Sequence, residues 1–507
     1  MSDYNFLIES KLSPEQYSVL SLLSRSAYEQ GLNLYLVGGA VRDLTYGQQL
    51  VRDLDFALEG DPQRILSRLG SVDLSSMAAF TSRTGTGSGQ PPALDNQQFD
   101  PQTAAAELWF SNGVRVELGQ CREDVFSKPG QRPGMRPATI FEDLKRRDFS
   151  VNAMAISLHP NSRGLLLDPT NGAADIERRE LRVLHPRSFS EDPLRIYRFL
   201  RLALRLDFTP EERTKIYFET ALQNRVWERL DAAQQGRELR AILQEENPAR
   251  ILKVLAERKL LGGLDKKLAS TRIAYDRFSR SRAAAQTIPG ADGLLVNYLC
   301  LVERLSSSEK LRMAKKVLGS GKLIKEALNL EREAKKLARV LVSSKAALPH
   351  QVYSLLARES QHLLLFLLVY YPQAKIQSRV KNFLTKYLPL RAKLPRAELQ
   401  ALGFKPGVKF DQIIESIFLD QVDGKIKTPQ QLTKALRERA GIKEPPAVPE
   451  HRARRPRKPK EVAKAKRAGQ EAGVPSVNPP ESPSSAQTSP RAREKGKAPA
   501  RSIRQGS

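Results

Sequence analysis

The stretch Leu34–Asp61, LYLVGGAVRDLTYGQQLVRDLDFALEGD, decides the fold of the N-terminal part of this 507-residue chain. It reads as a strand, a pair of glycines, a short helix and a second strand that carries Asp53 and Asp55. Side chains alternate along a strand, so two carboxylates at this spacing point to the same side. A glycine turn lets a phosphate approach backbone N–H groups. The stretch therefore predicts a site for a metal and a nucleoside triphosphate.

The glycine pair, Gly38 and Gly39, precedes the predicted helix that carries Arg42 and Asp43. A helix N-terminus favours phosphate. The spacing matches neither GxGxxG nor GxxxxGK[ST]. The sequence therefore supports neither a dinucleotide-binding fold nor a P-loop. A glycine pair alone is compatible with an ordinary turn, and a lone DxD with a solvated strand face. It is the combination that favours the site.

Transfer of a nucleotidyl group requires that the charge on the α-phosphate be offset and that the attacking hydroxyl be activated. Two Mg²⁺ ions about 3.5–4 Å apart do both, and carboxylates hold them. Asp53 and Asp55 are the expected ligands. Val116 and Leu118 alternate with polar residues in a further predicted strand, and Glu117 lies on its polar face. We therefore expect Glu117 to be the third carboxylate.

Composition points to a polyanionic partner. The formal charge is +27, and residues 441–507 contribute only +10 of it, so the remainder is basic in its own right. Such a field favours nucleic acid first and an acidic membrane surface second. We recognise no signal peptide, and the longest apolar run, around Leu363–Tyr371, is too short to span a bilayer. We expect a soluble cytoplasmic protein that binds RNA and no membrane.

The pattern predicts an α+β chain. A helix over 13–30 leads into the first strand, Arg83–Thr103 reads as a long surface loop, and the pattern is helical from about Ser188 to Arg439. The tail is rich in proline and is expected to be disordered. The expected division is 1–30 (N-terminal helix), 31–160 (nucleotidyltransferase catalytic head), 161–250 (neck with a nucleotide-recognition helix and an RNA-binding region), 251–440 (helical body and tail) and 441–507 (disordered basic, proline-rich tail).

Five motifs stand in one order along the chain: GGAVRD (38–43), DLD (53–55), RRDFSVNA (146–153), LLDPTNGAADIERRELRVL (166–184) and EDPLRIYRFLR (191–201). Together they resemble the class II nucleotidyltransferases, the family of tRNA nucleotidyltransferases (CCA-adding enzymes) and bacterial poly(A) polymerases. The resemblance covers about 34–245. It implies a polymerase-beta-like nucleotidyltransferase head with a short sheet, followed by an all-α neck, body and tail.

The resemblance also implies roles for single positions. Asp53 and Asp55 match metal ligands, and Glu117 stands where members place an acidic strand residue. The implied substrates are ATP and CTP, and the implied partner is the 3′ end of RNA, above all tRNA. The positions that match nucleotide-binding residues are Gly38, Gly39, Arg42, Asp43, Arg147, Asp148, Asn152, Asp192, Arg195, Arg198 and Arg201.

Asp192 and Arg195 also suit base recognition on chemical grounds. Their spacing makes them neighbours on one helix face. Arg only donates hydrogen bonds and ionised Asp only accepts them. Cytosine and adenine each offer a ring-nitrogen acceptor beside an amino donor, so one pair can read both, whereas uracil and guanine present the opposite order. Mispaired buried groups cost several kcal/mol. The arginine stripe that runs on to Arg205 is equally typical of a solvated helix surface, and Arg205 is compatible with that role alone.

The sequence thus favours a template-independent enzyme that adds C and A of the CCA end, or only one of them, to tRNA from CTP and ATP, with release of pyrophosphate. A bacterial poly(A) polymerase is the first alternative, and the long basic tail favours it. An RNA-binding protein that has kept the fold without catalysis is the second. The presence of both Asp53 and Asp55 argues against it.

Overall fold

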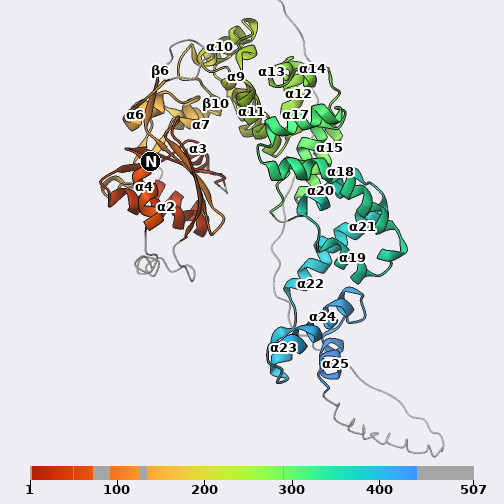
Figure 1. Cartoon of the computed structure of the whole chain (residues 1–507). Coiled ribbons are helices and arrows are strands. Elements are labelled where there is room, and N and C mark those ends of the chain that lie inside the picture. Colours follow the sequence, from red (N-terminus) through yellow and green to blue (C-terminus); the bar gives the residue numbers. More distant parts are fainter. Residues whose placement is uncertain (1–2, 49–50, 72–91, 126–133, 289, 442–507) are drawn as a thin grey trace, which may run out of the picture. The chain divides into compact units, whose positions relative to one another are not determined.

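The computed structural model describes residues 3–441 apart from 49–50, 72–91, 126–133 and 289 (Figure 1). The N-terminal part mixes strands with helices, and the part after residue 188 is almost wholly helical, so the predicted α+β class is confirmed. The strands are β1 Asn33–Val37, β2 Leu54–Glu59, β3 Leu94–Asp100, β4 Ala105–Phe110, β5 Arg115–Gln120, β6 Arg122–Val125, β7 Gly134–Pro137, β8 Ala155–Ser157, β9 Leu166–Leu167, β10 Glu180–Leu181 and β11 Thr209–Pro210.

Most helices lie in the C-terminal two thirds of the described chain. Those of the N-terminal part are α1 Tyr4–Lys11, α2 Pro14–Tyr28, α3 Gly39–Tyr46, α4 Pro62–Ser71, α6 Ile140–Lys145 and α7 Gly172–Arg178. The later ones are α8 Ser188–Glu191, α9 Leu194–Leu206, α10 Glu212–Gln223, α11 Ala232–Gln244, α12 Pro248–Glu257, α13 Leu261–Leu264, α14 Lys266–Ser270, α15 Tyr275–Ala285, α16 Leu294–Val302, α17 Ser307–Val317, α18 Gly321–Val342, α19 Pro349–Leu356, α20 Gln361–Tyr370, α21 Ala374–Asn382, α22 Leu388–Ala392, α23 Arg396–Ala401, α24 Val408–Val422 and α25 Pro429–Arg439.

A seven-stranded sheet in the order β3-β4-β5-β2-β1-β8-β9 organises the N-terminal part. β1 pairs antiparallel with β2 and β8, whereas β2 and β5 run parallel. Both faces of β1 are buried. Leu34 and Leu36 join the main core, and Tyr35 and Val37 join a smaller cluster that includes residues of α6. This smaller cluster fixes α6 against the face of the sheet on which the site residues lie.

Register places the predicted carboxylates on that face. Asp55 lies directly opposite Val37 of β1 and beside Glu117 of β5. Because opposed residues of paired strands point to the same face, Asp55 and Glu117 project together on the side that α6 covers. Asp53 differs from the prediction, because β2 begins at Leu54 and Asp53 is the residue just before the strand.

The predicted loop over Arg83–Thr103 is wrong in part. Residues 94–100 form the edge strand β3, which pairs antiparallel with β4. Its sequence, LDNQQFD, is polar and mostly exposed, so it lacks the apolar alternation that marks a half-buried strand. Backbone pairing holds it. The predicted loop residues 83–91, like the predicted disordered tail from residue 442 on, lie outside the described residues.

The helical part begins with α8 and α9. Among the described residues after Ser188, where the sequence predicts a helical pattern, β11 is the only strand, and it pairs in parallel with β10. α23, α24 and α25 carry a small core of their own around Phe410 and Ile417. No single described helix is long and apolar enough to cross a membrane; α19 and α20, bent by 118°, pass that test as a pair by length and composition alone.

Candidate active site

Asp53 and Asp55 lie at the start of β2, and Glu117 lies beside Asp55 on β5. Asp55 is half-buried, whereas Asp53 and Glu117 are exposed. Burial, followed by the charges of Glu117 and Asp53, raises the pKa of Asp55 to about 7. Like charges at such close range disfavour ionisation unless a cation offsets them. Oxygen ligands of this kind suit Mg²⁺, so the residues fit the ion that the sequence predicts. Within the described ranges no cluster of three or more acidic, His or Cys side chains has the geometry of a preformed metal cage.

The glycine turn brings a guanidinium to these carboxylates. Gly38 joins β1 to α3 with φ at 68°, a region that favours glycine. A Cβ at this position would lie 3.2 Å from Arg147 Nη1 and 3.3 Å from Asp55 Oδ2. Gly38 therefore occupies the gap between a carboxylate and an arginine. Gly39 begins α3, and its amide belongs to the free N–H groups of a helix N-terminus.

A chain of hydrogen bonds connects α3 to a later motif. Arg42 is buried and donates from Nε and Nη2 to Asp43 Oδ1, at 2.9 and 2.7 Å. Its Nη1 donates to Asn152 Oδ1 at 2.6 Å. Asn152 Nδ2 in turn donates to Asp148 Oδ1 at 3.0 Å. An ion pair extends this chain to α9, with Arg198 Nη2 2.6 Å from Asp148 Oδ2. Four predicted positions from two distant motifs and one from a third thus form one network.

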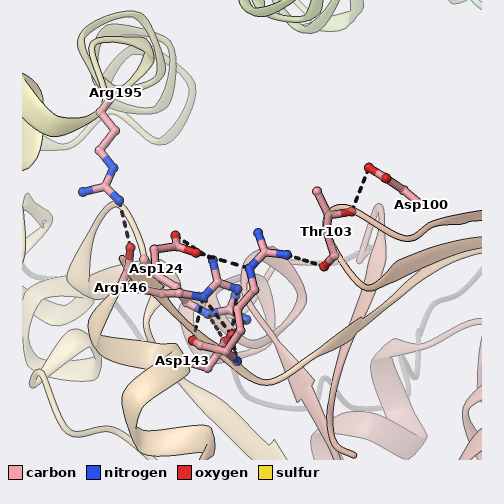
Figure 2. Close-up of polar contacts among 8 residues, drawn as sticks. Asp100, Thr103, Asp124, Asp143, Arg146 and Arg195 are labelled. Atoms are coloured by element: carbon pink, nitrogen blue, oxygen red, sulfur yellow. Dashed lines mark hydrogen bonds and ion pairs between the residues drawn. The ribbon is translucent and has the colours of Figure 1, made fainter. Parts of the chain in front are cut away.

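Asp143 of α6 is a residue that the sequence analysis did not single out. It is buried and forms an ion pair with Arg146 at 2.7 Å (Figure 2). A second ion pair, at 2.8 Å, joins it to Arg147. Burial opposes its charged form, but Arg147 and Arg146 outweigh that effect and lower the pKa of Asp143. Its position three and four residues before the two arginines is the helical spacing for ion pairs and was a usable signal. Asp143 holds Arg147 beside Asp55.

Arg195 reaches from α9 to the same cluster. Its Nη2 donates to the carbonyl oxygen of Arg146 at 2.8 Å, as Figure 2 shows, and its Nη1 donates to Ser188 Oγ at 2.7 Å. Arg195 Nε lies 3.7 Å from Asp192 Oδ2, so the predicted pair does come together. The predicted helix face is wrong, because α9 begins at Leu194 and Asp192 precedes its N-cap, Pro193, in extended backbone. Asp192 meets Arg195 through a turn, in which Asp192 Oδ1 accepts from Leu194 N–H.

Arg201 points away from this cluster. Its Nε and Nη1 donate to Glu238 Oε1 and Glu245 Oε1, at 2.8 and 2.9 Å. Both carboxylates are buried, and both belong to α11 or its C-terminus. Arg205, one turn further along α9, also approaches Glu245. The structure therefore brings Arg198 and Arg195 to the site and places Arg201 in the packing between α9 and α11. A role of Arg201 in nucleotide binding stays a prediction.

Residues 34–182 match the family model of the poly A polymerase head domain. Residues 34–182, which resemble this domain, are called the head domain below. The carboxylates, the glycine turn, Asp143 and the Arg42 network up to Asp148 lie inside the head domain, whereas Asp192, Arg195 and Arg198 follow it along the chain.

Known proteins resemble the chain beyond the head domain as well. It is 32% identical over 209 residues to an A-adding tRNA nucleotidyltransferase of Halalkalibacterium halodurans, over 41% of this chain and 44% of that protein. It is 34% identical over 248 residues to a CC-adding tRNA nucleotidyltransferase of Deinococcus radiodurans, over 48% and 59%. A solved structure of a CCA-adding enzyme in an apo form is 24% identical, over 85% and 98%, with a TM-score of 0.46. The chain spans less than two thirds of the length of the two curated relatives.

Proposed function

We propose that this chain is a template-independent nucleotidyltransferase that adds C and A residues to the 3′ end of tRNA from CTP and ATP. The similarity to A-adding and CC-adding tRNA nucleotidyltransferases supports the reaction class. The observation that carries the proposal is a series of polar contacts that connects the expected metal ligands to the expected base-recognition pair. Arg147, beside Asp55, and Arg195, beside Asp192, are joined through Asp143 and the carbonyl of Arg146.

The head domain supplies the grip on the triphosphate. The free amides at the start of α3 favour an anion, and Gly38 permits its close approach. Arg147 Nη1 lies against Gly38, which puts a cation at the same place. Arg42 packs against the turn at Gly39, and hydrogen bonds to Asp43 and Asn152 fix its guanidinium there. We assign the triphosphate to this corner.

Asp53 and Asp55 would hold the Mg²⁺ ions, with Glu117 next to them on the neighbouring strand. When bound, the ions offset the negative charge on the α-phosphate and lower the pKa of the attacking 3′-hydroxyl. Asp55 must then be ionised, and a cation favours its ionised form because it offsets the charges of Glu117 and Asp53 that raise its pKa.

Asp192 and Arg195 would select the base. Asp192 keeps about a third of its side chain exposed and can accept from the amino group of cytosine or adenine. Arg195 uses one Nη hydrogen on Ser188 and one on Arg146, which leaves further N–H donors for the ring nitrogen. The same two contacts fix the orientation of its guanidinium. Uracil and guanine would place a donor against Arg195 and an acceptor against Asp192.

Incorporation assays test the proposal. Purified full-length protein is given a tRNA that lacks its CCA end, with CTP and ATP separately and together, and product length is read. Addition that stops after one to three residues is the expected result. Long A tails on RNA other than tRNA would favour a poly(A) polymerase instead. Absence of incorporation under all conditions would leave the non-catalytic RNA-binding protein.

A further inference from the structure

A cavity of about 370 Å³ lies apart from the three carboxylates. Its walls come from the segment between α3 and β2, the C-terminal end of α9, the junction of α11 with α12, and α15. Four arginines, Arg52, Arg205, Arg250 and Arg282, line it. The charge of the cavity therefore depends on which carboxylates and carbonyl oxygens these four guanidinium groups contact.

The carboxylates of the cavity are already engaged. Asp43 accepts two hydrogen bonds from Arg42, which lies on the side of Gly39. Glu246 pairs with Arg282. Arg250 donates to the carbonyl of Leu204 and to Asp207. Asp43 and Glu246, the acidic groups of the cavity other than Glu245, thus each have one oxygen paired with an arginine.

Glu245 is shared among three arginines. Arg201 Nη1 donates to its Oε1 at 2.9 Å. Arg52 and Arg205 only approach it, at 3.6 Å each, a distance too long for a hydrogen bond. Glu245 Oε2 is buried and accepts no hydrogen bond from the described residues. Across the part of the chain that the structure describes, the guanidiniums of Arg52 and Arg205 have no hydrogen-bond acceptor.

Positive charge is therefore in excess at this cavity. Burial, followed by the charge of Arg42, lowers the pKa of Arg205 to about 10, although the charges of Glu245 and Asp43 act in the opposite direction. A bound anion would offset the positive charges around Arg205. It would also accept hydrogen bonds from the guanidinium groups of Arg52 and Arg205. Guanidinium forks match the oxygens of a phosphate group.

We propose that the cavity binds a phosphate group through Arg52 and Arg205. This second anion site would be separated from the triphosphate corner by the Arg42–Asp43 pair, since Asp43 lines the cavity and Arg42 lies against Gly39. The phosphate comes from the backbone of an RNA strand, which rests on the proposed function, or from free phosphate, which does not.

Two variants of the full-length chain separate these sources. Arg52 has about half of its side chain exposed, so Arg52→Gln should fold normally, and Arg205→Gln removes a crowded charge. Arg213→Gln, at an exposed position of α10, is the control for loss of one positive charge. The first readout is the rise in Tm with inorganic phosphate at constant ionic strength. The second is the affinity for a tRNA lacking CCA across a salt series.

A phosphate-dependent rise that both variants lose, with unchanged RNA binding, assigns the site to free phosphate. RNA binding that weakens about tenfold, with a salt slope lower by about one, assigns it to a strand phosphate. The proposal is overturned if both variants match Arg213→Gln in both readouts. Neither readout measures incorporation, so failure of the proposed reaction and failure of this site remain distinguishable.

Discussion

Asp148 and Arg198 form an ion pair between the head domain and α9, with 2.6 Å between Asp148 Oδ2 and Arg198 Nη2. Asp148 is buried, and its other oxygen accepts from Phe149 N–H and Asn152 Nδ2. Burial opposes the charged form. Arg198 and then the Asn152 hydrogen bond outweigh burial and lower the pKa of Asp148 to about 2. The pair connects the network of Arg42, Asn152 and Asp148 in the head domain to the helix that carries Arg195.

Asp148→Asn is expected to lower the free energy of unfolding by about 1–2 kcal/mol at pH 7, a value reduced for the exposed part of Arg198. A depressed carboxyl pKa contributes stability above its ordinary value of 3.8, and this contribution is lost as pH falls toward about 2. Urea unfolding at several pH values measures the effect. The gap between the two proteins should narrow between about pH 4 and pH 2, and a constant gap would contradict the assignment.

Asp143→Asn should weaken triphosphate binding, because Arg146 and Arg147 lose the buried carboxylate that holds them. We expect the KM for ATP to rise about tenfold and the free energy of unfolding to fall by about 2–4 kcal/mol. Steady-state kinetics and urea unfolding measure both. Glu123→Gln is the control, since it removes only the exposed pair with Arg136. An unchanged KM would mean that Asp143 has a structural role alone.

Arg195→Gln and Arg201→Gln separate base choice from packing on one helix. Arg195→Gln is expected to reduce the preference for ATP and CTP over UTP by about a hundredfold in kcat/KM. Arg201→Gln leaves Glu238 and Glu245 without their closest partner, so it should cost about 3–5 kcal/mol of stability with unchanged base preference. A change in base preference caused by Arg201→Gln would support the sequence-based role of Arg201 instead.

Gly38→Ala tests the close approach at the turn. Both Gly38 and Gly47 have positive φ, so alanine is strained at either position. The cost is about 1–2 kcal/mol at Gly47, which is in the left-handed α region, and about 1–3 kcal/mol at Gly38, whose ψ of −130° lies outside that region. Only at Gly38 would the new Cβ crowd Arg147 and Asp55, because nothing lies within 4 Å of that position at Gly47. Incorporation should fall about tenfold or more in Gly38→Ala and stay near wild type in Gly47→Ala. Equal losses would assign the effect to backbone strain.

Much of the site could be predicted because local patterns encode it. The glycine pair, the DxD and the Asp192–Arg195 spacing are each set by a few neighbouring residues, and β1, α3 and β2 follow from apolar periodicity. The register that places Glu117 beside Asp55 also agrees with the strand pattern of Val116 and Leu118.

Other features depend on tertiary contacts. β3 is polar and forms only through pairing with β4, so its sequence resembles a loop. Arg201 shares its spacing with Arg195 and Arg198, and the buried carboxylates of a later helix draw it away. The three-way sharing of Glu245 joins residues from separate elements and carries no local signal.

Replacement of the two DxD carboxylates tests the central claim most directly. Asp53→Asn/Asp55→Asn is compared with Asp61→Asn, an exposed position whose side chain can still accept from Gln63 N–H. Single-turnover incorporation from CTP and ATP into tRNA lacking its CCA end is measured at the same concentration of folded protein for each variant. The account predicts a loss of about a thousandfold or more in the double variant and near wild-type rates in Asp61→Asn. Incorporation by the double variant at a rate close to wild type would contradict it.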